Sequence, residues 1–139
     1  MKVIFLDIDG VLNYRGVSDV CPKAVSLLND LLEKTEANIV ISSSWRIYMS
    51  MIRIRDELVG AGFGFPERII GSTPYVPERE RGYEIKLWLK QVPVDKFVIL
   101  DDRDDVGNLF PFLVKTDTFI GLQQVHVDKA FKILMGSHD

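Results

Sequence analysis

The first residues whose types suggest chemistry are two aspartates, Asp7 and Asp9, separated by a single position. They follow an apolar run at residues 3–6, which contains β-branched residues and no polar alternation, as is typical of a buried parallel strand. Because an unpaired carboxylate is costly to bury, we expect both aspartates where the strand leaves its sheet, at the edge where parallel sheets bind ligands. Gly10 would let the backbone turn sharply around such a ligand. The segment therefore predicts a reaction centre.

Two more of the predicted strands also end in small polar or acidic side chains. Serines follow the second strand, and a pair of aspartates follows the fourth. In a doubly wound parallel sheet the carboxyl ends of the strands lie along one edge, so residues far apart in the sequence converge there. These residues are Ser42, Ser43 and Ser44 after residues 38–41, and Asp101 and Asp102 after residues 97–100.

Four carboxylates gathered at one edge would repel one another, since a pair at ~4 Å costs ~4 kcal/mol at an effective dielectric of about 20. Such a cluster persists by binding a proton or a cation. Oxygen ligands with no His or Cys nearby in the sequence favour Mg²⁺ over zinc, and Mg²⁺ with open coordination positions normally serves a phosphate. The serines would then donate hydrogen bonds to phosphate oxygens. Arg46 and Arg81 are candidates for neutralising the charge of the phosphate.

The elements that would position these residues alternate between apolar runs and segments of helical periodicity. A helix beginning at Pro22 follows the first strand, and apolar residues then recur at helical spacing from Ile47 to Leu58. This alternation predicts an α/β, three-layer Rossmann-like fold, with a five-stranded parallel sheet and helices on both faces. The predicted strands cover residues 3–6, 38–41, 68–71, 97–100 and 112–116. Later helices are expected to pack through Ile85, Trp88 and Leu89, and through Val127, Ala130, Phe131 and Leu134.

Composition limits the classes of protein that fit. The length of 139 residues suits one domain over residues 1–139, and the net charge of −3 gives no global basic field for nucleic acid. The single Cys21 excludes an internal disulfide and a cysteine-based zinc site. Without a signal sequence or a long apolar run, we expect a cytoplasmic location and no membrane partner. His126 and His138 have no partner pattern and are expected at the surface.

The strand-end clusters, in this order, resemble the motifs of the haloacid dehalogenase-like (HAD) phosphohydrolases over nearly the whole chain. The first motif of that superfamily is similar to D-I-D-G-V-L-N at residues 7–13. Its Ser/Thr motif matches Ser43, and its terminal acidic motif matches Asp101 and Asp102. Within the superfamily, the chain looks most like the small HAD domains of Swiss Army Knife RNA repair proteins, through S-S-W-R, R-G-Y-E-I-K-L-W-L and I-L-D-D.

The resemblance implies a Mg²⁺-dependent phosphohydrolase that cleaves phosphomonoesters. Asp7 would attack phosphorus and form an aspartyl-phosphate, while Asp9 would protonate the leaving oxygen and then activate water. The implied magnesium ligands are Asp7, the carbonyl oxygen of Asp9, Asp101 and Asp102. The implied contacts to phosphate come from Ser43, with Ser44 as its neighbour, and from Arg81.

Several assignments stay open at this point. The family usually carries a lysine before the fourth strand, and the basic residues available here are Arg79, Arg81 and Lys86, of which Arg81 fits best. The run of serines at residues 42–44 leaves the motif position uncertain by one. Arg46 either contacts the substrate or faces solvent in a first helical turn. Asp105 either supports the metal site or forms part of a solvated acidic turn.

Many HAD enzymes carry an inserted cap domain over the active site. Here the segments that could hold a cap, at residues 13–20 and 72–80, are too short for a domain. We therefore expect a capless protein with an open site, covered only by these two loops. An open site suits a bulky substrate, such as a nucleic-acid end or a phosphoprotein, or else a partner subunit that acts as the lid.

Two functions of other classes remain open. A phosphoryl-accepting signalling domain also gathers aspartates on a five-stranded sheet, but it needs an acceptor aspartate after the third strand, where residues 69–72 read I-I-G-S. A nucleic-acid repair or binding module without turnover is disfavoured by the net acidity. Arginines such as Arg53, Arg55 and Arg79 nevertheless leave room for a local basic rim.

Overall fold

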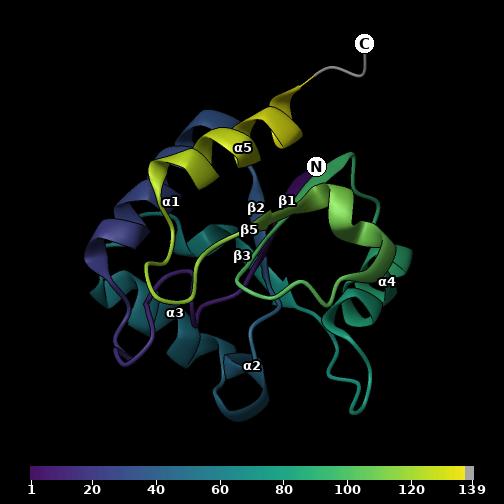
Figure 1. Cartoon of the computed structure of the whole chain (residues 1–139), viewed down its shortest axis with the longest axis horizontal. Helices are drawn as coiled ribbons and strands as arrows, with labels where there is room; N and C mark the ends of the chain where they lie inside the picture. Colours follow the sequence, from purple (N-terminus) through teal and green to yellow (C-terminus); the bar gives the residue numbers. More distant parts are fainter. Residues whose placement is uncertain (137–139) are drawn as a thin grey trace.

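The structure, a computed structural model, describes residues 1–136 and is built on one five-stranded sheet (Figure 1). All neighbouring strands are parallel and follow the order β3-β2-β1-β4-β5, so β1 occupies the centre. The apolar runs of the sequence form these strands because a parallel sheet is covered by helices on both faces, so its three central strands are largely buried, whereas the two edge strands are partly exposed. The strands are β1 (Lys2–Leu6), β2 (Asn38–Ile41), β3 (Ile69–Ser72), β4 (Lys96–Asp101) and β5 (Leu113–Lys115).

Helices connect or follow the strands. The first of them has Pro22 in its opening turn, where the missing N–H breaks no intrahelical hydrogen bond. The helices are α1 (Pro22–Thr35), α2 (Trp45–Tyr48), α3 (Met51–Gly60), α4 (Arg81–Gln91) and α5 (Gln124–Met135), with 3₁₀ turns η1 (Pro66–Arg68) and η2 (Gly107–Phe112). Within residues 1–136, no helix has both the length and the apolar character that crossing a membrane requires.

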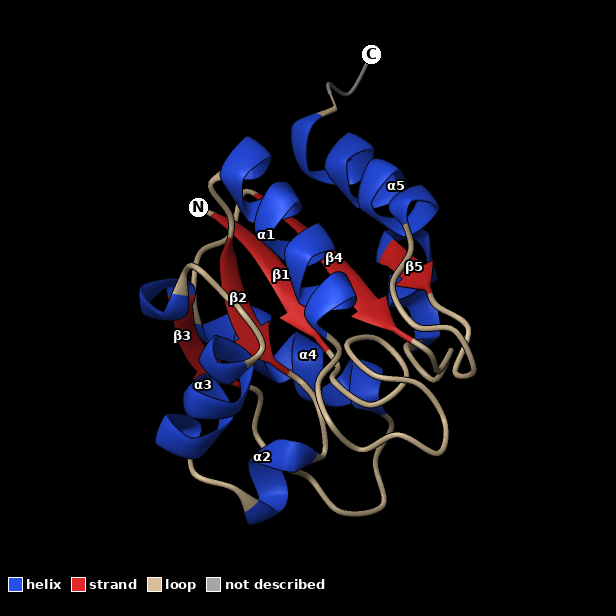
Figure 2. Ribbon diagram, turned by 90° about the vertical axis from the view of Figure 1, so that its left-hand side faces the viewer, coloured by secondary structure: helices blue, strands red, loops and turns tan. Residues whose placement is uncertain are grey.

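Side chains of β1 alternate between two apolar cores, one on each face of the sheet. Ile4 and Leu6 belong to a core shared with α1, α3 and α5, whereas Val3 and Phe5 belong to a core shared with α4 and η2. In Figure 2, α1 and α5 lie side by side in front of the sheet, with α4 behind it. This arrangement confirms the predicted three-layer, Rossmann-like α/β fold.

The register of the central strands sets the position of the residues that follow them. Leu6 of β1 pairs with Ile41 of β2 on one side and with Leu100 of β4 on the other. The ladder continues past the end of β1, because the next main-chain N–H donates to the carbonyl of Leu100 at 3.0 Å. The residues after these three positions therefore emerge side by side at one edge, and they are Asp7, Ser42 and Asp101.

Two loops flank this edge, the connection from β1 to α1 at residues 7–21 and the connection from β3 to α4 at residues 73–80. Neither contains a helix or strand of its own, so the fold is capless over the residues that the structure describes, as predicted. The first loop includes an isolated bridge between Tyr14 and Val17. We call residues 13–18, which surround this bridge, the flap.

One predicted helix is wrong. The apolar spacing of residues 47–58 predicted a single helix, but the chain forms α2 and α3 with an extended Met49 between them. Ser50 begins the second helix, since its hydroxyl accepts a hydrogen bond from the Arg53 N–H at 3.2 Å. Ile47 is consequently 47% exposed instead of lying on a buried stripe. The hydrogen bond from the Arg53 N–H to the Ser50 cap stabilises a new helix start at this point, although the apolar periodicity continues through it.

Smaller differences concern single positions. The third strand lies one residue further along the chain than the predicted residues 68–71. Phe131, expected inside, is 37% exposed on α5. His126 is half-buried, and its Nδ1 accepts a hydrogen bond from the Gln123 N–H at 2.9 Å where α5 begins. His138 lies outside the described residues.

Candidate functional site

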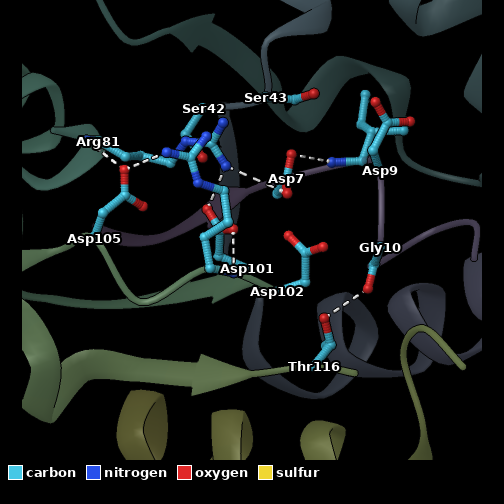
Figure 3. Close-up of polar contacts among 12 residues, drawn as sticks. Asp7, Asp9, Gly10, Ser42, Ser43, Arg81, Asp101, Asp102, Asp105 and Thr116 are labelled. Atoms are coloured by element: carbon cyan, nitrogen blue, oxygen red, sulfur yellow. Dashed lines mark hydrogen bonds and ion pairs between the residues drawn. The ribbon is translucent and has the colours of Figure 1, made fainter. Parts of the chain in front are cut away.

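The structure brings together the carboxylates of Asp7, Asp101 and Asp102 at the carboxyl edge of the sheet (Figure 3). Each residue offers one oxygen atom, and these atoms all lie within 4.8 Å of one another. Asp7 is 4% exposed and Asp101 is fully buried, whereas Asp102 is half-buried. The in-register ends of β1 and β4 thus place three carboxylates in one small volume, which we call the acidic cluster.

Arg81, the first residue of α4, supplies the cation that contacts this cluster. Its Nη1 lies 2.6 Å from Oδ2 of Asp101 and 3.3 Å from Oδ2 of Asp7. The side chain is 7% exposed, and its main-chain N–H donates to Oδ2 of Asp105 at 3.4 Å. Neither Nε nor Nη2 donates to another of the described residues, so the guanidinium retains donors for a ligand.

The other two basic candidates lie away from the carboxylates. Arg79 is exposed and stacks on a neighbouring tyrosine ring at 3.7 Å, and Lys86 forms no ion pair within residues 1–136. Gly82 explains how Arg81 reaches the cluster, because a Cβ at this glycine would lie 2.4 Å from the carbonyl oxygen of Val106. The close approach brings the first turn of α4 against the loop that follows β4.

Charge in the acidic cluster is not balanced, since three carboxylates face one guanidinium. Burial, together with the Asp101 carboxylate, raises the pKa of Asp7 well above its usual range, and Arg81 offsets this only in part. Burial likewise raises the pKa of Asp101. For Arg81, burial acts to lower the pKa, but the Asp7 and Asp101 carboxylates outweigh it, so the pKa is raised and the guanidinium stays protonated. The protein alone supplies one cation for three carboxylates, so the cluster favours binding a proton or a further cation.

The excess charge and the donor atoms of the acidic cluster fit a hard divalent cation. All three ligand atoms are carboxylate oxygens, which Mg²⁺ prefers, and Mg²⁺ sites in proteins commonly use only a few carboxylates. A nearby cation would also favour the ionised form of Asp7, opposing the effect of burial. The carboxylate of Asp9 is not part of the group, so a metal contact from Asp9 would come from its main-chain carbonyl, as the family resemblance implied.

Asp9 lies on the other side of Asp7 from Arg81 in Figure 3, and it is exposed. Its Oδ1 accepts two hydrogen bonds, from the Asn13 amide at 2.9 Å and from the indole N–H of Trp45 at 3.0 Å. Its Oδ2 accepts none from the described residues. One oxygen therefore fixes the carboxylate, while the other is available to exchange a proton with a ligand.

Gly10 allows the loop after β1 to pass close to Asp102. The glycine has φ +81°, and a Cβ there would lie 2.2 Å from Oδ2 of Asp102. Its carbonyl oxygen accepts the hydroxyl hydrogen bond of Thr116 at 2.7 Å, and its N–H donates to Oδ1 of Asn13 at 2.8 Å. The hydroxyl of Thr118 donates to Oδ2 of Asp102 at 2.8 Å. Segments from both ends of the chain thus hold this turn in place.

The three serines occupy different environments. Ser42 and Ser43 are fully buried, whereas Ser44 is half-buried at the N-cap position of α2. Oγ of Ser43 accepts the N–H of Trp45 at 3.2 Å, which leaves the hydroxyl hydrogen of Ser43 free to donate. Oγ of Ser42 has no hydrogen-bond partner among the described residues. Figure 3 shows both at the edge occupied by Asp7, and which serine contacts a phosphate stays a prediction.

Arg46 is neither solvent-facing nor directed at the acidic cluster. Its side chain is 5% exposed, and burial lowers its pKa against the opposing effect of Glu84. All five N–H donors of a guanidinium are matched by acceptors here. These acceptors are the carbonyl oxygens of Ser42, Ser43, Thr73 and Pro74 and the carboxylate of Glu84. A contact between Arg46 and a phosphate would have to displace one of these bonds.

Sequence reasoning missed four side chains that support the site. Trp45 packs in the apolar core, and its indole N–H also reaches Asp9, which its apolar character did not indicate. Thr116 and Thr118 follow β5, whose end lies at the same edge of the sheet, so the strand-end rule could have found them. Glu84 carries no local signal, because its partner Arg46 is 38 positions away.

Comparison with known families gives a match over residues 3–127, to the model described as the HAD domain in Swiss Army Knife RNA repair proteins. A search of curated proteins found no match. The matched region includes the acidic cluster, the serines after β2 and the α4 arginine, in the order that the resemblance required. The chain therefore belongs to the HAD domain family of Swiss Army Knife RNA repair proteins and is a HAD-type hydrolase.

Proposed function

We propose that this chain is a Mg²⁺-dependent phosphomonoesterase that works through an aspartyl-phosphate on Asp7. The observation that carries the proposal is the convergence of three carboxylates within 4.8 Å, beside one buried guanidinium and at an edge that no cap covers. This combination suits a phosphate dianion bound together with a hard cation. Family membership supports hydrolysis as the reaction class.

Asp7 is the proposed nucleophile because the protein fixes its orientation from both sides. Its Oδ1 accepts the N–H of Ile8 at 2.9 Å, and its Oδ2 lies 3.3 Å from Nη1 of Arg81. A carboxylate oxygen of Asp7 attacks phosphorus, so that a new P–O bond forms while the bond to the leaving oxygen breaks. Little rearrangement is needed, because the side chain is already held at the end of the central strand.

Asp9 is the proposed proton donor and acceptor. In the first step its carboxyl group protonates the leaving oxygen, and in the second it takes a proton from the water that attacks the aspartyl-phosphate. Inorganic phosphate then leaves and Asp7 is regenerated. The hydrogen bonds from Asn13 and Trp45 hold Oδ1 of Asp9, which leaves Oδ2 to carry the proton.

The negative charge of the transferring group needs donors around it. Nε and Nη2 of Arg81 have no partner among the described residues, so they can donate to phosphate oxygens while Nη1 holds the carboxylates. The free hydroxyl hydrogen of Ser43 is a further donor. Magnesium held by Asp7, Asp101, Asp102 and the Asp9 carbonyl would supply the remaining charge compensation when bound.

A phosphorylated nucleic-acid end is the proposed substrate class. The family is described by its occurrence in RNA repair proteins, and the capless edge admits a large molecule. A phosphoprotein is the other bulky substrate that the same opening admits. A receiver-type acceptor role is not favoured, because the residue after β3 is Thr73 and not an aspartate. Binding alone is not favoured either, because three clustered carboxylates beside Arg81 suit hydrolysis of a phosphate ester.

The test is a substrate panel assayed for released phosphate in the presence of Mg²⁺. It should contain 3′- and 5′-phosphorylated oligonucleotides, mononucleotides, a sugar phosphate and a phosphopeptide. We expect turnover that disappears with a chelator and returns with added Mg²⁺. Asp7→Asn should lower kcat by about a thousandfold or more, since it removes the nucleophile.

The matched control is Asp30→Asn, which makes the same charge change on an exposed position of α1 and should keep full activity. Full hydrolysis by the Asp7→Asn chain would overturn the nucleophile assignment. Turnover that persists in excess chelator would overturn the requirement for a divalent cation.

A further inference from the structure

A pocket of about 400 Å³ opens beside the acidic cluster, and the proposed chemistry gives it no role. On one side it borders Asp9, Gly10 and Asp102, which belong to the site. The rest of its lining comes from the flap, residues 13–18, and from Thr118. A ligand in this pocket would therefore lie next to the group that delivers a proton to the leaving oxygen.

Hydrogen bonds hold the lining of this pocket in place although its residues lie on loops. The Arg15 N–H donates to the carbonyl of Thr118 at 2.8 Å, and the Thr118 hydroxyl donates to Asp102 at 2.8 Å. Within the flap, the Val17 N–H donates to the Tyr14 carbonyl at 2.9 Å. Because the flap is tied to the acidic cluster, the pocket is preformed, which lowers the entropic cost of binding.

The side chains of the flap favour a flat, partly apolar ligand. Tyr14 is 39% exposed and Val17 is 38% exposed, so both offer apolar surface to a ligand. The Arg15 guanidinium lies 5.4 Å from the ring of Phe119, which holds a second planar group near the pocket. The flap contains no carboxylate. An aromatic ring beside a guanidinium is the combination that proteins use to stack unpaired nucleobases.

The volume and position of the pocket restrict the class of ligand further. Its volume lies near the lower end of the range for small-molecule sites, which suits a single nucleoside better than a folded peptide segment. The leaving group of a phosphomonoester is bonded to the oxygen that Asp9 would protonate, and Asp9 borders the pocket. A leaving nucleoside would therefore extend from the phosphate toward the flap.

We propose that the flap pocket binds the nucleobase of the nucleotide whose phosphate is removed. The proposal rests on the proposed function, because that function defines where the phosphate lies. Tyr14 provides the stacking surface, and Arg15 contacts the polar edge of the base. A free mononucleotide and the terminal nucleotide of a strand share this chemistry, so the experiment includes both.

The test compares substrates that differ only in the base. Oligonucleotides phosphorylated at the 3′ or the 5′ end are prepared with a normal terminal nucleotide or with an abasic one, and mononucleotides are compared with ribose phosphates. For at least one end, we expect kcat/KM to be about tenfold to a hundredfold higher with the base present, the range given by stacking of one base. Tyr14→Ala should reduce this ratio to about one while leaving hydrolysis of glycerol phosphate unchanged.

The matched control is Phe131→Ala, which removes an aromatic side chain of similar exposure from α5 and should keep the full ratio. Equal kcat/KM for normal and abasic substrates in the wild type would overturn the proposal, as would a phosphopeptide preferred over every nucleotide. Retention of the full ratio by Tyr14→Ala would also overturn it.

Binding to the Asp7→Asn chain separates failure of this proposal from failure of the phosphatase proposal. If no phosphomonoester is hydrolysed, the affinities of this chain for normal and abasic ends are measured by fluorescence anisotropy. A preference for the base that is lost on adding Tyr14→Ala supports the pocket assignment even then. Equal affinities would overturn it.

Discussion

Two buried arginines at the same edge of the sheet are used in opposite ways. Arg46 pairs with the single carboxylate of Glu84 at 2.8 Å, and protein acceptors match all of its donors. Arg81 is just as buried, but it faces two ionisable carboxylates directly, with Asp102 beside them. The first pair is balanced in charge and hydrogen bonding, whereas the second group has excess negative charge and unused donors.

This difference in balance distinguishes an ion pair that supports the fold from a group of charges that can bind a ligand. A balanced buried ion pair needs no further partner, and the Arg46–Glu84 pair connects the ends of β2 and β3 to α4. An unbalanced group is unfavourable until something else binds, which is the state expected of a site before its ligands arrive. The four predictions below test this contrast, and each alters either the Arg46–Glu84 pair or the acidic cluster around Arg81.

The largest change in stability is expected from breaking the balanced pair. Glu84→Ala leaves Arg46 buried without its partner and removes the acceptor of the Val76 N–H, so the free energy of unfolding should fall by about 3–5 kcal/mol. Denaturant unfolding followed by circular dichroism measures this. Glu80→Ala, at an exposed position that forms no side-chain cap, should change stability by under about 0.5 kcal/mol. Similar effects of the two changes would show that the pair is not a structural support.

Distorting the acidic cluster should weaken metal binding by a smaller free energy. Gly10→Ala places a Cβ 2.2 Å from Oδ2 of Asp102, which must then move. We expect the apparent affinity for Mg²⁺, measured from activity against Mg²⁺ concentration, to fall by about tenfold to a hundredfold. Gly62→Ala introduces a residue at a similarly positive φ with no atom within 4 Å, so it reproduces the backbone strain alone. Equal Mg²⁺ affinities in the two variants would contradict the role of this close approach.

Relieving the imbalance should stabilise the protein while abolishing its activity. Without Mg²⁺, Asp7→Asn removes a charge that burial and the Asp101 carboxylate disfavour, so Tm should rise by a few degrees. Differential scanning calorimetry in the presence of chelator measures the shift. Asp30→Asn, which changes an exposed residue, should leave Tm within about a degree. A lower Tm for Asp7→Asn would mean that the ion pair with Arg81 outweighs burial.

The smallest expected effect is a change with pH in the Tm difference between Asp7→Asn and wild type. The pKa of Asp7 is raised in the folded state, so the fold binds its proton more tightly than the unfolded chain does. The cost of ionising Asp7 is thus absent at low pH and grows as the pH rises above its usual value of 3.8. The Tm advantage of Asp7→Asn over wild type, both without Mg²⁺, should be larger at pH 7.5 than at pH 4.5. An advantage that is constant over this range would contradict the raised pKa.

The fold and the acidic cluster follow from local features of the sequence. Each strand is a short apolar run, and the polar residues that matter most stand immediately after these runs. Parallel pairing in register then brings Asp7 and Asp101 to the same level without further information. The resemblance to the HAD motifs rests on the same positions, which is why the family match agrees with it.

The features that the sequence did not reveal depend on contacts between distant segments. Spacing alone could not show that Arg46 is held by Glu84, or that the indole N–H of Trp45 reaches Asp9 from 36 positions away. The break between α2 and α3 is different, because it depends on a local signal: Ser50 is a recognisable helix cap, which apolar periodicity alone does not contain.

The position of β1 at the middle of the sheet determines which residues can change among related proteins and which cannot. The proposed nucleophile, Asp7, directly follows this central strand, whereas Tyr14 and Val17 lie on a surface loop that contains no helix or strand. Surface loops tolerate replacement far better than central strands do. We therefore expect related chains to differ in the phosphate esters that they accept through changes at a few flap positions, while the residues that follow the central strands stay the same.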